Sequence, residues 1–147
     1  MTAETIIKKL ENGRAEFAYR CVNEAKQPDT SKYKENISSD YKAYIKKISP
    51  LVMTNGIGNT LAYIVSKGKA HNKKEKNNAY DLIYAQLSAW LSNENNGCIL
   101  LPSDTYLLEF IISQPSTVYR QITTETLAFL NWLRRLSEGM IEGDEDE

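Results

Sequence analysis

The chain has 147 residues, of which 41% are hydrophobic and 25% charged, and its formal net charge is −1. These values are typical of one globular domain with an ordinary buried core. No apolar run approaches the roughly 20 residues of a membrane span, and residues 1–13 contain no signal-peptide core. We therefore expect a cytoplasmic protein. Cys21 and Cys98 are far apart in the sequence, which favours two reduced thiols.

The small net charge conceals an uneven distribution. Five of the 19 acidic residues lie within residues 142–147, so residues 1–141 carry 18 bases against 14 acids, a net charge of +4. A block of like charges at the end of a chain is usually disordered. We expect a single helical domain over residues 1–141, followed by a disordered acidic tail over residues 142–147.

Apolar residues in the first half recur every three or four positions, which predicts helices. The first helix is expected over residues 6–25 and ends before the polar stretch at 27–36. Ser38, Ser39 or Asp40 is expected to cap the second helix, which continues to about residue 54. Pro50 lies inside this pattern, so we expect a bend or a shifted hydrogen-bond ladder there.

The sequence Asn55-Gly56-Ile57-Gly58 interrupts two helical patterns. A β-hairpin would need flanking strands, and a dinucleotide-binding loop would need a third glycine where Leu61 stands. We therefore interpret it as a joint, in which Gly56 ends one helix in a left-handed conformation and Gly58 or Asn59 opens the next. A backbone anion site at the start of that next helix is a further possibility.

The second half continues the helical pattern. Helices are expected over residues 57–67, 80–91, 103–113 and 123–139, with residues 115–121 as the approach to the last one. The only strand candidate is the short sequence CILL at 98–101. The prediction is a compact all-α bundle of about six helices.

Catalytic and metal-binding patterns are weak. The single histidine, His71, lies in the lysine-rich loop at 68–78, and no second ligand stands at helical spacing from it. We expect no enzymatic activity, no cofactor and no metal.

Two features of the charged residues stand out: Arg14 on an apolar face, and basic pairs on two helices. Arg14 falls within the apolar face of the first helix, so it must either be paired within the chain, with Glu125 as a candidate, or reach a partner protein. Lys42 and Lys46 are neighbours on the second helix, and Arg134 and Arg135 lie on the last. The last helix is apolar on two sides, which makes it either central in the bundle or half of an interface.

Two stretches carry a resemblance to a known family. The sequence YKAYIKKISPLVMTNGIGNTLAYIVSKG, followed later by YRQITTETLAFLNWLRRLSEGM, resembles the small helical subunit of the Cmr complex, the type III-B CRISPR RNA-targeting effector. The sequence GRAEFAYRCV near the N-terminus is also similar to that family. The resemblance covers the first three helices and the last one.

The resemblance implies a non-catalytic antiviral-defence protein that stacks along the guide RNA–target RNA duplex. Its implied partners are the two RNA strands, further copies of itself and other Cmr subunits, including the large palm-domain subunit. We assign contacts with the RNA backbone to Lys42, Lys46, Lys67, Arg134 and Arg135. The subunit interface is assigned to Leu127 and Leu130.

Two alternatives remain open at this stage. The first is a helical adaptor that binds only proteins, with its lysines solvated. The second is a DNA-binding helix-turn-helix protein, although the helix after Gly58 has few side chains suited to reading bases.

Removal of residues 142–147 should leave the melting temperature nearly unchanged, because a block of five acids cannot be buried in a core. Thermal unfolding followed by circular dichroism measures this. A large drop would show that the tail belongs to the folded domain.

Overall fold

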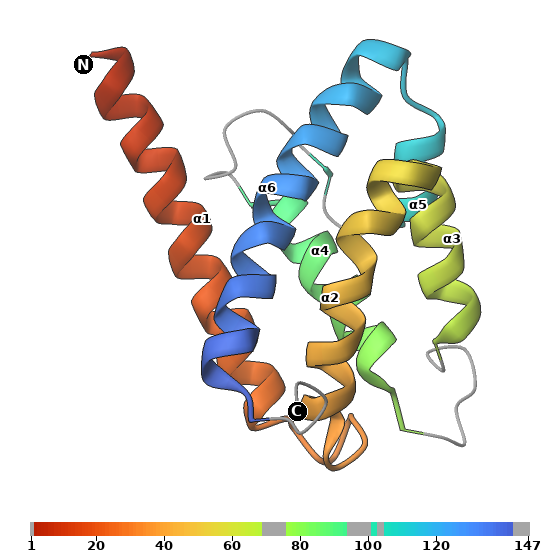
Figure 1. Ribbon diagram of the computed structural model, residues 1–147. Coiled ribbons are helices and arrows are strands. Elements are labelled where there is room, and N and C mark those ends of the chain that lie inside the picture. Colours follow the sequence, from red (N-terminus) through yellow and green to blue (C-terminus); the bar gives the residue numbers. More distant parts are fainter. Residues whose placement is uncertain (1, 69–75, 94–100, 103–104, 143–147) are drawn as a thin grey trace.

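The computed structural model describes residues 2–68, 76–93, 101–102 and 105–142. Within these ranges it contains no strand and six helices, which confirms the all-α prediction (Figure 1). They are α1 (Ala3–Lys26), α2 (Ile37–Asn55), α3 (Ile57–Lys67), α4 (Ala79–Leu91), α5 (Leu107–Ile112) and α6 (Ser116–Met140). Most of the loop at 68–78, His71, Cys98 and the tail beyond Glu142 lie outside the described residues.

The last helix, α6, packs between α1 and α2. Its most extensive contacts are with α1 on one side and α2 on the other, and α3 and α4 pack against α2. Figure 1 shows α2 and α6 side by side, with the end of α6 near the start of α2. Of the two explanations for the apolar sides of α6, the central position is therefore confirmed.

An aromatic cluster joins α1, α4 and α6 in the core. The rings of Trp90 and Phe129 are stacked at 5.3 Å, and Phe17 packs against both at 5.2 and 5.9 Å. Such pairs contribute about 0.5–1.5 kcal/mol beyond the burial of their area. The cluster fixes how the three helices meet.

The predicted pairing of Arg14 with Glu125 is confirmed. Arg14 donates from Nε to Glu125 Oε2 and from Nη2 to Oε1, both at 2.8 Å. The Trp90 indole donates to the same carboxylate at 2.9 Å. Glu11 accepts from Arg14 at 2.9 Å and from the Trp132 indole at 2.7 Å. Glu125 is only 5% exposed, so these donors replace the water that its charge has lost.

The largest differences from the predicted helix boundaries are at the starts of α5 and α6. The described part of the fifth helix, α5, begins only at Leu107, and α6 begins at Ser116 instead of Thr123. Residues 116–121 contain few apolar residues, so no apolar periodicity predicted a helix there. Their helix is nevertheless initiated by Pro115, whose carbonyl accepts from the Tyr119 N–H at 2.9 Å.

The predicted cap of α2 is wrong. The helix begins at Ile37, and its N-cap is Asn36, which has a φ of 64° and makes no side-chain cap hydrogen bond. Asparagine tolerates this left-handed conformation better than most residues, so it can redirect the chain into the helix. Further along, α2 continues through Pro50. Because proline has no N–H, it cannot donate the usual helical hydrogen bond to the carbonyl four residues earlier.

The Asn55–Gly58 segment is a helix joint, as predicted. Gly56 alone separates α2 from α3, with φ 85° and ψ 159°, a conformation that is essentially restricted to glycine. The expectation that Gly58 or Asn59 opens the next helix is wrong, since α3 begins at Ile57. The Tyr119 hydroxyl accepts from the Gly58 N–H at 2.9 Å. The Tyr119 side chain therefore occupies one of the backbone N–H groups that the predicted anion site would need as a donor.

Gly56→Val should destabilise the protein by about 1–3 kcal/mol, because a β-branched residue is strained at positive φ. The added Cβ would also lie 3.2 Å from the Tyr119 hydroxyl oxygen. Urea unfolding measures the change. Gly139→Ala is the matched control, because a Cβ there meets no atom within 4 Å, and it should keep or raise stability. Equal stability of wild type and Gly56→Val would contradict this assignment of the joint.

Candidate nucleic-acid interface

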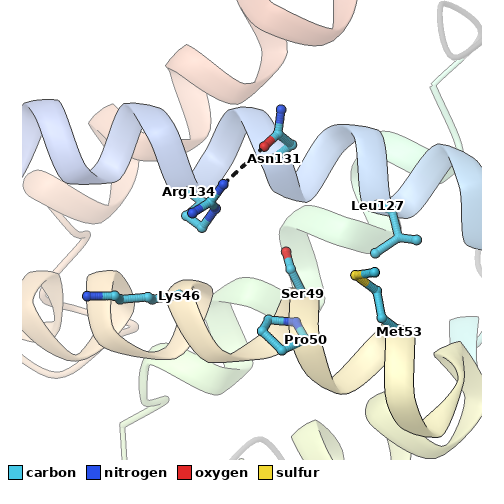
Figure 2. A pocket seen from close by; sticks show the side chains of 7 residues that line it. All are labelled: Lys46, Ser49, Pro50, Met53, Leu127, Asn131 and Arg134. Atoms are coloured by element: carbon cyan, nitrogen blue, oxygen red, sulfur yellow. Dashed lines mark hydrogen bonds between the residues drawn. The ribbon is translucent and has the colours of Figure 1, made fainter.

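A groove of about 350 Å³ runs between α2 and α6 (Figure 2). Its walls have helical spacing on both sides, so each helix contributes one face. The lining residues are Lys46, Ser49, Pro50 and Met53 from α2 and Leu127, Asn131 and Arg134 from α6. The groove brings together two of the residues assigned to RNA and one of those assigned to a subunit interface.

The two ends of the groove differ in chemistry. In Figure 2 the side chains of Lys46 and Arg134 lie toward one end, while Leu127 and Met53 lie together toward the other. Met53 is 75% exposed, which leaves an apolar side chain in water. Arg134 donates to Asn131 Oδ1 at 3.4 Å, and no carboxylate among the described residues forms a salt bridge with it. The basic end suits a phosphate, and the apolar end suits an apolar side chain.

Lys42 does not belong to this surface, and its assignment as an exposed phosphate contact is wrong. It is only 6% exposed. It lines a separate hollow with Glu138, Glu142 and the residues between them, where the end of α6 passes over α2. The sequence pattern could not show that Lys42 is covered, because the cover comes from residues 138–142, almost a hundred positions later in the chain.

Two further basic residues lie elsewhere. Lys67 is at the end of α3, and its ammonium group lies 5.7 Å from the centre of the Tyr63 ring. Arg135 is exposed on α6, but it is not among the residues that line the groove. Both are exposed and lie outside the groove itself.

Leu130 is a core residue, so its assignment to a subunit interface is wrong. It is 0% exposed, whereas Leu127 is half-buried and lines the groove. The buried residues of α6 form one broad stripe, because both α1 and α2 cover it. What the sequence suggested as a second, outward apolar side is therefore mostly internal.

The described residues contain no group of three or more potential ligands that could hold a metal ion. Burial, the largest effect, raises the pKa of the Cys21 thiol to about 12, so this cysteine is protonated and unreactive at neutral pH. Across the described part of the chain, no helix is long and apolar enough to cross a membrane.

The structure thus defines the class of protein as an all-α domain. A groove between two of its long helices is basic at one end and apolar at the other. Residues 10–140 match the model of the family described as "CRISPR-associated protein (Cas_Cmr5)". The chain therefore belongs to the Cmr5 family, the small subunits of Cmr complexes.

A solved structure has the same fold. The crystal structure of a CRISPR-associated Cmr5 family protein from Thermus thermophilus is similar with a TM-score of 0.66 and 22% sequence identity. The similarity covers 90% of this chain and 98% of that chain. At this identity, the comparison supports the fold.

Leu130→Ala should lower the free energy of unfolding by about 2–5 kcal/mol, the range for a buried leucine that leaves a cavity. Leu127→Ala should cost clearly less, because Leu127 already touches water in the groove. Urea unfolding of the two variants tests this order. A smaller loss of stability for Leu130→Ala than for Leu127→Ala would contradict the assignment of Leu130 to the core.

Proposed function

We propose that the protein is a non-catalytic subunit of a type III-B Cmr ribonucleoprotein in the cytoplasm and that it stacks along the guide RNA–target RNA duplex. Family membership supports its place in a Cmr complex. The single observation that carries the RNA-binding role is the groove that places Lys46 and Arg134 together on an accessible surface. The net positive charge of residues 1–141 favours the same role.

The basic residues contact phosphates and not base edges. A subunit that serves any guide must bind RNA without reading its sequence, and contacts with the backbone carry no sequence information. Lys46 and Arg134 form the centre of this surface, and Arg135 and Lys67 contact further phosphates outside the groove. Lys42 is excluded by its burial.

The apolar end of the groove contacts another subunit. An exposed methionine beside a half-exposed leucine is an adaptable apolar surface of the kind that protein interfaces use. The partner is a neighbouring copy or the large palm-domain subunit. Repeated stacking along a duplex uses two different surfaces, so it does not need to close into a ring.

Replacement of Lys46 and Arg134 by alanine should weaken binding to unrelated single-stranded RNAs by the same factor. The slope of log affinity against log salt should fall by about 0.7 for each phosphate that the variant no longer neutralises. Fluorescence anisotropy over a salt series measures both quantities. Lys9→Ala is the control, because Lys9 is an exposed lysine on α1. Weakening confined to one RNA sequence would contradict backbone recognition.

Met53→Asp should leave the isolated protein folded but exclude it from the assembled complex, because the charge falls on an exposed side chain at the proposed subunit contact. Circular dichroism and co-purification with the other subunits measure the two effects. Normal incorporation would place the subunit contact elsewhere. A complex that forms normally while the chain binds no RNA would favour the protein-only adaptor.

A further inference from the structure

A second cationic surface lies where α2, α3 and α4 meet. We call it the tyrosine–lysine cluster, and it consists of Tyr44, Lys47, Tyr63, Lys67 and Tyr80. The rings of Tyr44 and Tyr80 are stacked, with centres 3.9 Å apart, and the Tyr63 ring meets Tyr80 edge-on at 5.9 Å. Tyr80 is buried, whereas Tyr44 and Tyr63 are partly exposed. The three rings thus pack together, and both lysines lie close to one of them, Tyr63.

The ammonium group of Lys47 lies over these rings. Its Nζ is 5.3, 5.5 and 5.6 Å from the centres of the Tyr44, Tyr63 and Tyr80 rings and donates to the Tyr63 hydroxyl at 3.2 Å. Lys67, four residues after Tyr63 on α3, approaches the same Tyr63 ring to 5.7 Å. Both lysine side chains are exposed. Two positive charges therefore converge on one tyrosine.

The two charges have no counter-ion in the described part of the chain. Neither Lys47 nor Lys67 forms a salt bridge there. Hydrogen bonding, first with Tyr80, raises the pKa of Lys47, so the ammonium form persists at neutral pH. Hydrogen bonds from Tyr80 and then Lys47 lower the pKa of Tyr63. Tyrosine hydroxyls and lysine ammonium groups are all donors to an anion.

We propose that the tyrosine–lysine cluster binds a phosphodiester group of an RNA strand, at a site separate from the groove between α2 and α6. An anion placed between Lys47 and Lys67 would neutralise both charges and accept a hydrogen bond from the Tyr63 hydroxyl. Lys46 and Lys47 are consecutive, so they project about 100° apart around α2. One strand that crosses α2 can therefore contact the groove and the cluster in succession.

The identity of the ligand as RNA rests on the proposed function, whereas the anion site itself does not. The first measurement uses a short fluorescent oligouridine at low salt. Lys47→Met should weaken its binding about three- to tenfold and lower the salt slope by about 0.7, the value for one phosphate on a single strand. Tyr63→Phe keeps the ring and should cause a smaller loss. The exposed Lys9→Met, on α1, should have no effect.

The second measurement needs no RNA. Tripolyphosphate is titrated into protein with isotope-labelled tyrosine rings, and the ring signals are followed by NMR. The Tyr63 signal should move and saturate in the wild type but not in Lys47→Met, with circular dichroism confirming that both are folded. The absence of any movement in the wild type would overturn the site.

The two measurements separate the two ideas. Saturable tripolyphosphate binding at Tyr63 without oligouridine binding would contradict the proposed RNA function and leave the anion site standing. The double variant Lys47→Met, Lys67→Met could instead bind oligouridine as strongly as the wild type. That result would contradict phosphate binding at the tyrosine–lysine cluster, while the proposed RNA binding at the groove would still stand.

Discussion

The ion pair between Arg14 and Glu125 restricts how α1, α4 and α6 can pack against one another. A nearly buried carboxylate is costly unless its charge is paired and its oxygens are hydrogen-bonded. Glu125 on α6 meets this condition only when Arg14 of α1 and the indole of Trp90 on α4 reach it together, at 2.8 and 2.9 Å. One register of the three helices satisfies this carboxylate, and the loss of one partner from such a buried pair typically costs about 3–5 kcal/mol.

That register decides which surfaces remain for function. With one flank of α6 held against α1 and α4, the opposite flank lies against α2, and the groove with Lys46 and Arg134 forms along their boundary. The Gly56 joint then places α3 beside α2, so that Tyr63 of α3 meets Lys47 of α2. Lys46, Lys67, Arg134 and Arg135 lie on helices and not on loops, which suits the proposed contact with an RNA backbone.

Periodicity and isolated anomalies in the sequence were enough to predict much of this structure. The helical stripes, the glycine joint and the partner of Arg14 each follow from spacing or from a charge on an apolar face. The misassignments have a common cause, because periodicity shows which residues share a face but not what covers that face. Leu130 is covered by neighbouring helices, and Lys42 lies where the end of α6 passes over α2. Lys47 gains its surroundings only when three helices bring their tyrosines together.

The most direct test is photocrosslinking within the assembled ribonucleoprotein. A photoreactive amino acid at Asn131 would lie in the groove, and one at the exposed Glu16 of α1 would serve as the control. If the groove holds an RNA backbone, the residue at position 131 should crosslink to the guide or target strand with any guide sequence, and the control should not. Crosslinks from position 131 to protein alone, with none to either RNA strand, would contradict the RNA-binding role of this groove.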